Sequence, residues 1–142
     1  MDDFLQVACA VCLTANRVPA ARAAEGPKCG KCGAPLLDGA TIALDDQTFD
    51  VFISRTRMPV VVDFWAAWCG PCRAMAPQFA QAAVAVRTSV RFAKVDTEAA
   101  RATAARFGIR SIPTLILFRD GREEKRISGA LDARSLGEWL SK

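Results

Sequence analysis

Hydrophobic positions from residue 41 onward fall into short blocks, whose spacing alternates between that of strands and that of helices. The run PVVVDFWA at 59–66 is continuously β-branched and aromatic, which is typical of a strand buried on both faces. The alanine-rich run at 73–87 predicts a helix, kinked at Pro77 because proline lacks the N–H that a helix interior needs. The same spacing rules predict strands at 41–44, 90–96, 114–118 and 124–128, and helices at 48–56, 97–108 and 132–142.

Turn and capping residues between these blocks mark where the predicted strands and helices end. RDGR at 119–122 predicts a turn between the last two strands, and Asp132 is placed to cap the final helix. The resulting order is β-α-β-α-β-α-β-β-α. Strands that alternate with helices predict an α/β fold, in which a mixed central sheet carries helices on both faces as a three-layer sandwich.

The first 38 residues do not share this pattern. They hold four of the six cysteines and too few apolar residues for a core of their own, so a metal or disulfides must help them fold. We therefore divide the chain into a cysteine-rich N-terminal module at 1–38, whose metal is considered below, a connection at 39–46 and a larger domain at 47–142.

Composition and charge narrow the classes of function. The net charge of the 142 residues is only +4 and the basic residues are scattered, so nucleic-acid binding is not expected. No run approaches the roughly 18 apolar residues of a membrane span, and the N-terminus lacks the basic region of a secretory signal. We expect a cytoplasmic protein, in which cysteine pairs mostly serve metal binding or redox chemistry.

All six cysteines lie in C-x-x-C pairs, and the first two pairs have the spacing C-x2-C-x16-C-x2-C. Their members are Cys9, Cys12, Cys29 and Cys32. This is the spacing of a four-thiolate zinc site, with Gly30 and Gly33 expected to turn N–H groups toward the sulfurs. Such a site is closed and stabilises rather than catalyses. Two disulfides, or free thiols in a loose tail, are the alternatives.

The third pair, CGPC at 69–72, falls between a predicted buried strand and a helix. Cys69 is then at the helix N-terminus, where free N–H groups and the helix dipole stabilise a thiolate, and Pro71 suits the first turn. One helical turn brings the two sulfurs within bonding range. We assign Cys69 as the nucleophile because it should be the more exposed thiol, and Cys72 as the resolving thiol on the inner side.

Asp63 is the only charged residue in VVVDFWAAW, on a strand predicted to be buried. A buried carboxylate has a raised pKa and can transfer protons near neutral pH, so Asp63 is placed to deprotonate Cys72. Lys94, on the next strand, is a candidate charge partner. The alternatives are a solvent-facing aspartate at the end of the strand and an ordinary exposed lysine.

The segment SIPT at 111–114 contains a candidate cis peptide at Pro113, with a trans proline that starts a strand as the alternative. Trp68 and the segment at 129–131 are candidates for an apolar rim beside the CGPC pair. For Trp65 and Trp139 the alternative is simple core packing, which we favour for Trp139.

Together these motifs resemble the thioredoxin family. Residues 47–142 match it through VVVDFWAAWCGPCR, FAKVD, FGIRSIPTLILF, DGR and SGAL and through their separations. Residues 1–46, with CAVC and CGKCGAPL, are similar to the zinc-bearing extension of bacterial thioredoxin 2. The resemblance implies a thioredoxin fold with an N-terminal module like a zinc ribbon.

The resemblance also implies a protein-disulfide reductase. Cys69 would attack a client disulfide, Cys72 would resolve the mixed disulfide, and Asp63 with Lys94 would assist Cys72. An NADPH-dependent thioredoxin reductase would return the electrons, and one zinc ion would be the only cofactor of a bacterial, cytoplasmic monomer. The implied docking surface consists of Trp68, Gly70, Pro71, Ile112, Pro113, Gly129 and Ala130.

Two positions depart from the family pattern. Ala67 replaces the usual proline between the tryptophans, and Ser111 stands where glycine is commonest. The absence of histidine excludes the CGHC pair of isomerases, and Gly-Pro favours a reductant. Competing hypotheses are a zinc-dependent chaperone or docking module, and an oxidase or isomerase. A zinc site beside a redox domain also suggests that oxidants could release the metal.

Overall fold

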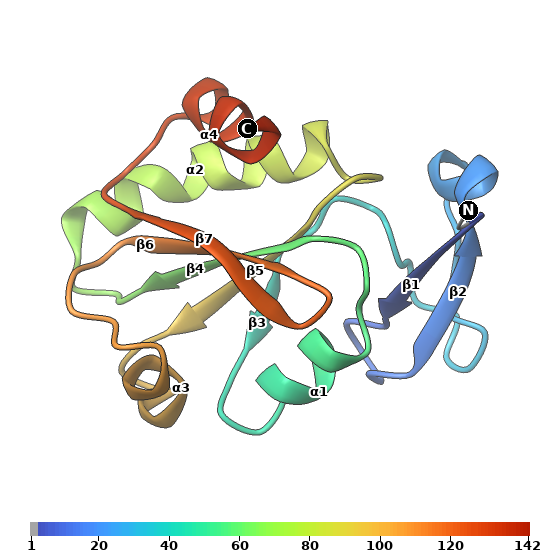
Figure 1. The fold of residues 1–142 in the computed structure, drawn as a ribbon, viewed down its shortest axis with the longest axis horizontal. Helices are drawn as coiled ribbons and strands as arrows, with labels where there is room; N and C mark the ends of the chain where they lie inside the picture. Colours follow the sequence, from blue (N-terminus) through green and yellow to red (C-terminus); the bar gives the residue numbers. More distant parts are fainter. Residues whose placement is uncertain (1–2) are drawn as a thin grey trace.

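The computed structural model describes residues 3–142, and most of these residues are arranged around one five-stranded sheet (Figure 1). The strand order is β3-β5-β4-β6-β7, in which β3, β5 and β4 are parallel while β6 and β7 are antiparallel to their neighbours. The bounds of these strands are β3 Ile42–Leu44, β4 Val60–Trp65, β5 Arg91–Asp96, β6 Thr114–Arg119 and β7 Arg122–Ser128.

Helices cover both faces of this sheet, which confirms the predicted three-layer sandwich (Figure 1). One face carries α2 (Gly70–Ala85) and α4 (Ala133–Ser141), and the other carries α1 (Phe49–Ser54) and α3 (Arg101–Arg106). Because successive side chains of a strand point to opposite faces, Val61 packs under α2 and α4 while Val62 packs on the side of α1. Strand β4 is therefore apolar on both faces, as its sequence predicts.

The predicted elements are found with small changes at their ends. Helix α3 is shorter than predicted because residues 97–99 form a turn, in which the Asp96 side chain accepts the N–H of Glu98 at 2.9 Å. Asp132 caps α4 as predicted, by accepting the N–H of Ser135 at 2.8 Å. Helix α2 runs unbroken past Pro77, and a kink there stays a prediction. No helix in 3–142 combines the length and apolarity required to cross a membrane.

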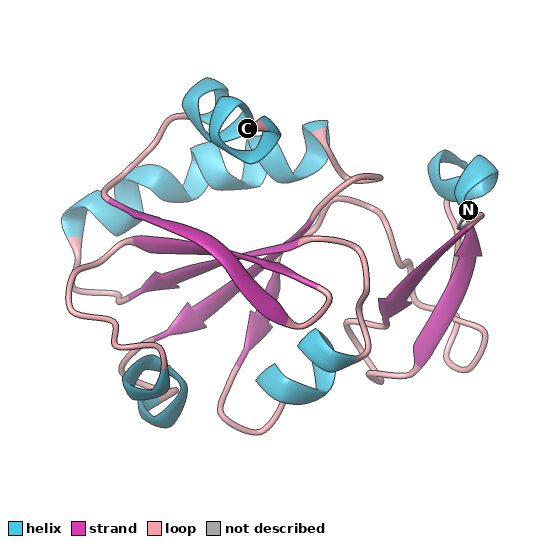
Figure 2. Cartoon of the chain, in the orientation of Figure 1, coloured by secondary structure: helices cyan, strands magenta, loops and turns pink. Residues whose placement is uncertain are grey.

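The N-terminal residues form an antiparallel hairpin that the sequence pattern did not reveal (Figure 2). Strand β1 (Phe4–Ala8) pairs with β2 (Ala15–Pro19), and a 3-10 helix (Ala20–Glu25) follows. The small core beneath the hairpin is formed by Val7, Cys9, Val18, Ala23, Cys29, Leu36, Leu37 and Met58. Met58 belongs to the larger domain, so the module is not complete without a side chain from outside it.

Four hydrogen bonds join the hairpin to the loop between α1 and β4, and two of them involve Arg55, which accepts from the Gln6 side chain and donates to the carbonyl of Leu13. The N–H of Ala8 donates to the hydroxyl of Thr56 at 3.1 Å, and both groups are buried. The N–H of Arg57 donates to the carbonyl of Gln6 at 2.8 Å. The strand predicted at the end of the connection is the edge strand β3 of the large sheet. The exact domain boundaries stay predictions.

Candidate active site and metal centre

The CGPC pair opens α2. Cys69 is the N-cap residue, with an extended backbone, and its sulfur accepts the N–H of Cys72 at 3.2 Å. A disulfide joins Cys69 to Cys72, and Pro71 lies in the first helical turn as predicted. In this oxidised form both cysteines are buried, with 4% and 2% of their surface exposed, so exposure alone barely distinguishes them.

The loop before β6 lies directly against the disulfide. The Cys69 sulfur is 3.7 Å from the carbonyl oxygen of Ile112, and the Ile112–Pro113 peptide is cis, which confirms that expectation. The carbonyl of Pro113 accepts the N–H of Gly129 at 2.9 Å, and Gly129 has the positive φ of 103° that glycine tolerates. The loop before β6 therefore contacts the disulfide through Ile112, and it contacts the segment after β7 through Pro113.

Apolar residues beside the disulfide are exposed to solvent. Trp68 is 69% exposed, and Gly70, Pro71 and Ala130 also lie at the surface. The predicted rim residues are thus accessible beside the disulfide, whereas Pro113 is buried beneath them.

Asp63 is fully buried in β4, which contradicts the solvent-facing alternative. Neither carboxylate oxygen has a hydrogen-bond partner within residues 3–142. Burial raises the pKa of Asp63 to about 7, and the positive charge of Lys94 opposes the rise. Lys94 is the register neighbour of Asp63 on β5, yet its ammonium lies 4.5 Å from the ring centre of Trp65 and forms no ion pair in the described chain.

The four N-terminal cysteines converge. Their sulfur atoms all lie within 4.8 Å of one another, and each pair closes the same kind of turn. The N–H of Leu13 bonds the carbonyl of Cys9, and the N–H of Gly33 bonds the carbonyl of Cys29, each at 2.9 Å. Leu13 and Gly33 both have positive φ, 63° and 80°. Two matched turns thus present four sulfurs to one point, which excludes a loose tail.

Hydrogen bonds from the backbone reach these sulfurs, although not from the predicted glycines. Val11 donates to the Cys9 sulfur at 3.3 Å and Lys31 to the Cys29 sulfur at 3.4 Å. The N–H of Gly30 instead donates to the Asn16 side chain, at 3.0 Å. Hydrogen bonds from the N–H of Cys32, the Asn16 amide and the N–H of Lys31 lower the pKa of Cys29 to about 6. These four cysteines could bind a metal ion as thiolates.

Comparison with known proteins matches both parts of the chain. The family model described as Thioredoxin matches residues 40–142, and the model described as Thioredoxin 2, N-terminal, matches residues 8–34. The chain belongs to the thioredoxin family. Thioredoxin C-3 of Corynebacterium nephridii is 48% identical over 134 residues, which cover 94% of this chain and 92% of that protein. Thioredoxin of Mycobacterium tuberculosis (strain ATCC 25618 / H37Rv) is 44% identical over 102 residues, 72% of this chain and 88% of its own length.

Family membership confirms the predicted thioredoxin fold with its zinc-ribbon module, and it confirms the predicted class of enzyme. Thioredoxins are thiol-disulfide oxidoreductases, and the Cys69–Cys72 disulfide provides the dithiol that such an enzyme requires. Trp139, for which core packing was favoured, packs partly buried against the cluster under α2 and α4.

Two surface grooves carry no sequence motif. One, of about 400 Å³, begins at Trp68 and Ile112 beside the disulfide and runs along α3 past Glu98, Arg101 and Arg110. Neither arginine forms an ion pair in residues 3–142. The only sequence signal for this groove was the presence of basic residues in the FGIRSIPT segment and the preceding helix.

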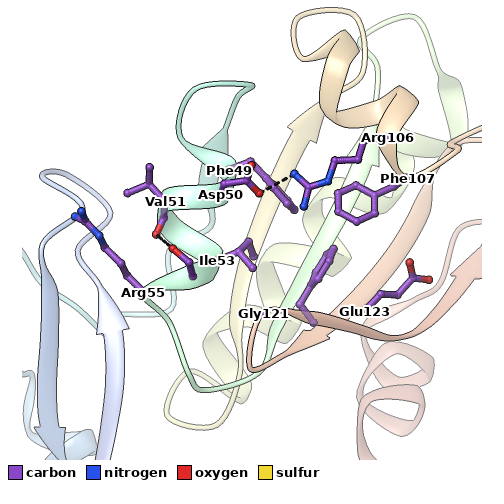
Figure 3. A pocket seen from close by; sticks show the side chains of 11 residues that line it. Phe49, Asp50, Val51, Ile53, Arg55, Arg106, Phe107, Gly121 and Glu123 are labelled. Atoms are coloured by element: carbon purple, nitrogen blue, oxygen red, sulfur yellow. Dashed lines mark hydrogen bonds and ion pairs between the residues drawn. The ribbon is translucent and has the colours of Figure 1, made fainter.

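The second groove, of about 450 Å³, lies between α1, the end of α3 and the turn after β6 (Figure 3). An ion pair of 2.7 Å between Asp50 and Arg106 crosses it, and the side chain of Phe107 lies beside that arginine (Figure 3). None of the predicted site residues lines this groove. It is therefore separate from the candidate active site.

Proposed function

We propose that this thioredoxin-family chain reduces disulfide bonds in client proteins, with Cys69 as the attacking thiol. The position of the Cys69 sulfur carries this proposal. It caps α2, receives an N–H from the first turn, and lies beside the carbonyl of Ile112 at an otherwise exposed surface. The helix N-terminus stabilises a thiolate, and a thiolate is the reactive form in disulfide exchange.

The reaction is a two-electron exchange in two steps. The Cys69 thiolate attacks one sulfur of the client disulfide, so that a mixed disulfide forms and the other client sulfur leaves as a thiolate that takes up a proton. Cys72 then loses its proton and attacks the Cys69 sulfur, which releases the second client thiol. The client is reduced to a dithiol, and the enzyme is left with the Cys69–Cys72 disulfide seen in the structure.

Asp63 is the proposed acceptor for the proton of Cys72. Its near-neutral pKa allows it to take and return a proton at physiological pH, and no hydrogen bond in the described residues occupies its oxygens. Lys94, across the strand pair, favours the ionised form of Asp63 and in this way adjusts its pKa. Both roles require that the buried carboxyl reach Cys72 directly or through a water molecule.

Clients are proposed to dock on the exposed rim around the disulfide. An extended client segment would lie against Trp68 and hydrogen-bond the backbone of Ile112, whose carbonyl already faces the Cys69 sulfur. The remaining docking residues are Gly70, Pro71, Pro113, Gly129 and Ala130. An NADPH-dependent thioredoxin reductase is the proposed electron donor, and the protein is proposed to act as a cytoplasmic monomer.

The metal is proposed to be one zinc ion held by Cys9, Cys12, Cys29 and Cys32. The fit rests on four soft thiolate donors whose sulfurs lie within 4.8 Å of one another, with backbone N–H groups directed at two of them. All four donors come from protein, so the site supplies folding stability to a module with little core. A measurement of one zinc per purified chain would support this assignment.

Insulin reduction tests the catalytic proposal. Cys69→Ser should abolish turnover, whereas Cys72→Ser should accumulate a mixed disulfide with the client, because the resolving thiol is missing. In a zinc-dependent chaperone or docking module, the alternative function, neither substitution would matter to the main activity. An unchanged rate in Cys69→Ser would refute the reductase proposal.

A further inference from the structure

One buried cation is explained neither by the proposed redox chemistry nor by the fold. Arg91, the first residue of β5, is only 3% exposed, and its Nε atom has no hydrogen-bond partner within residues 3–142. No ion pair of the described chain includes it. A buried donor without a partner is costly, so the Nε–H of Arg91 requires a physical explanation.

The guanidinium lies at the seam between the N-terminal module and the sheet. Its central carbon is 6.0 Å from the ring centre of Phe52, and Phe52 belongs to the same buried cluster as Ala8. Ala8 directly precedes the metal-site residue Cys9, which is fully buried. The N–H of Arg91 donates to the carbonyl of Pro59 at 2.8 Å, and the preceding residue Met58 packs in the same buried cluster as Cys9 and Cys29. Arg91 therefore begins its strand at the edge of the metal module.

Two negative groups act on Arg91. Burial lowers the pKa of Arg91, and the charges of Asp38 and Cys9 oppose this effect. Asp38 is exposed and uses one oxygen to accept the N–H of Ala40 at 3.0 Å, so water and the backbone already satisfy it. Cys9 is buried, and its sulfur would carry part of the negative charge of a loaded site. Four thiolates around one divalent ion leave a net charge of −2.

We propose that Arg91 is the buried counter-charge of the metal-loaded four-cysteine site, and that it links metal occupancy to the docking of the module on the sheet. This inference rests on the proposed metal site. The N–H of Ala8 donates to Thr56, and Arg57 and the Gln6 side chain complete the neutral hydrogen bonds of the seam. The one charged hydrogen bond runs from the guanidinium of Arg55 to the carbonyl of Leu13 at 2.8 Å, and Arg55 is exposed to water. Arg91 is buried, so water screens it least from the charge of the loaded site.

Zinc affinity of the full chain tests this proposal, by competition with a chelator of known affinity. Arg91→Met keeps an unbranched stem that ends at the ε position and removes the charge, and should weaken zinc binding by about 10- to 100-fold, the usual effect of losing a group that supports metal ligands. Arg91→Lys retains the charge and should recover part of the loss. An arginine with a purely structural role would destabilise the metal-free and zinc-loaded proteins alike and leave the affinity unchanged.

Asp38→Asn is the matched control. It removes the other negative charge near Arg91 and should leave zinc affinity within about twofold of wild type. The proposal is overturned if Arg91→Met binds zinc as tightly as wild type. It is also overturned if Asp38→Asn weakens binding as much as Arg91→Met and the double variant adds nothing. A wild-type chain that binds no zinc would instead refute the metal site itself.

A measurement on the unmodified protein covers the case in which Arg91→Met does not fold. The Nε–H group of Arg91 can be followed by ¹⁵N NMR in zinc-loaded and metal-free wild type. We expect a slowly exchanging signal in the loaded form that shifts or exchanges faster once the metal is removed. A signal that is the same in both forms overturns the proposal.

Discussion

Replacement of Asp63 by asparagine should stabilise the oxidised protein at neutral and alkaline pH. The carboxyl group is buried without a hydrogen-bond partner in residues 3–142, and burial raises its pKa to about 7 from the ordinary 3.8. Between these two values the folded protein keeps its proton while the unfolded chain has lost it. Unfolding then releases a proton, so the free energy of unfolding falls as pH rises from about 4 to about 7 and levels off above that.

The magnitude follows from the same two pKa values. At 1.36 kcal/mol for each pKa unit, ionised Asp63 costs the folded protein about 4 kcal/mol above pH 7. Asparagine does not titrate, so the variant should be more stable than wild type by up to this amount at pH 8. The buried amide still lacks a partner, which reduces the gain by about 1–3 kcal/mol and acts equally at all pH values.

Urea unfolding of the oxidised proteins between pH 4.5 and pH 8.5 measures this effect, and oxidation removes the titration of the two active-site thiols. Asp46→Asn is the control, and its effect on the free energy of unfolding should have the opposite sign. Hydrogen bonds from the hydroxyl and the N–H of Thr103 lower the pKa of Asp46, so its ionised form stabilises the fold and its removal should destabilise it at neutral pH. A stability difference between Asp63→Asn and wild type that does not change with pH would refute the reasoning.

Three further predictions concern packing, docking and the metal. Gly39→Ala should lower the free energy of unfolding in urea by about 1–3 kcal/mol, because φ is +84° and the new Cβ would lie 2.9 Å from the Cα of Val84. Gly121→Ala is the control: its φ is similar but its new Cβ meets no atom within 4 Å, so its cost should be smaller. Arg101→Gln with Arg110→Gln should slow reduction of acidic disulfide peptides several-fold at low salt but not neutral ones, as seen in stopped-flow rates. Chelation of the metal should lower the temperature at which the module unfolds, followed by circular dichroism, yet leave insulin reduction within about twofold.

The large domain was predictable because each of its elements is encoded locally. Strand β4 is apolar on both faces, and every position from Val60 to Phe64 is buried, which only a central strand allows. Spacing alone did not distinguish the three cysteine pairs. Their roles followed from context, since two pairs complete one cluster of four sulfurs and the third opens a helix.

The N-terminal hairpin was not predictable in the same way. Its strands are five residues long, and only Val7, Ala8 and Val18 are buried in them, so they lack the alternation that identifies longer strands. The turns at the cysteines hold it in place, and one of them requires Leu13 in a left-handed conformation that its residue type disfavours. Arg91 was likewise only one of the scattered basic residues of the sequence, because burial at a seam between two parts of a chain leaves no local pattern.

The two unpartnered buried charges, Arg91 and Asp63, lie on the same pair of parallel strands but on opposite faces of the sheet. Val60 pairs with Arg91 and Asp63 pairs with Lys94, so three residues of β4, about 10 Å, separate the seam from the proton acceptor. Alternation along β5 places Arg91 on the side of α1, with Ala93 and Val95, whereas Asp63 shares the side of Val61 beneath α2. Side-chain contact between them is therefore impossible. The metal site and the disulfide are therefore connected through the packed backbone and not through direct contact of these charges, which is why loss of the metal should affect stability far more than chemistry.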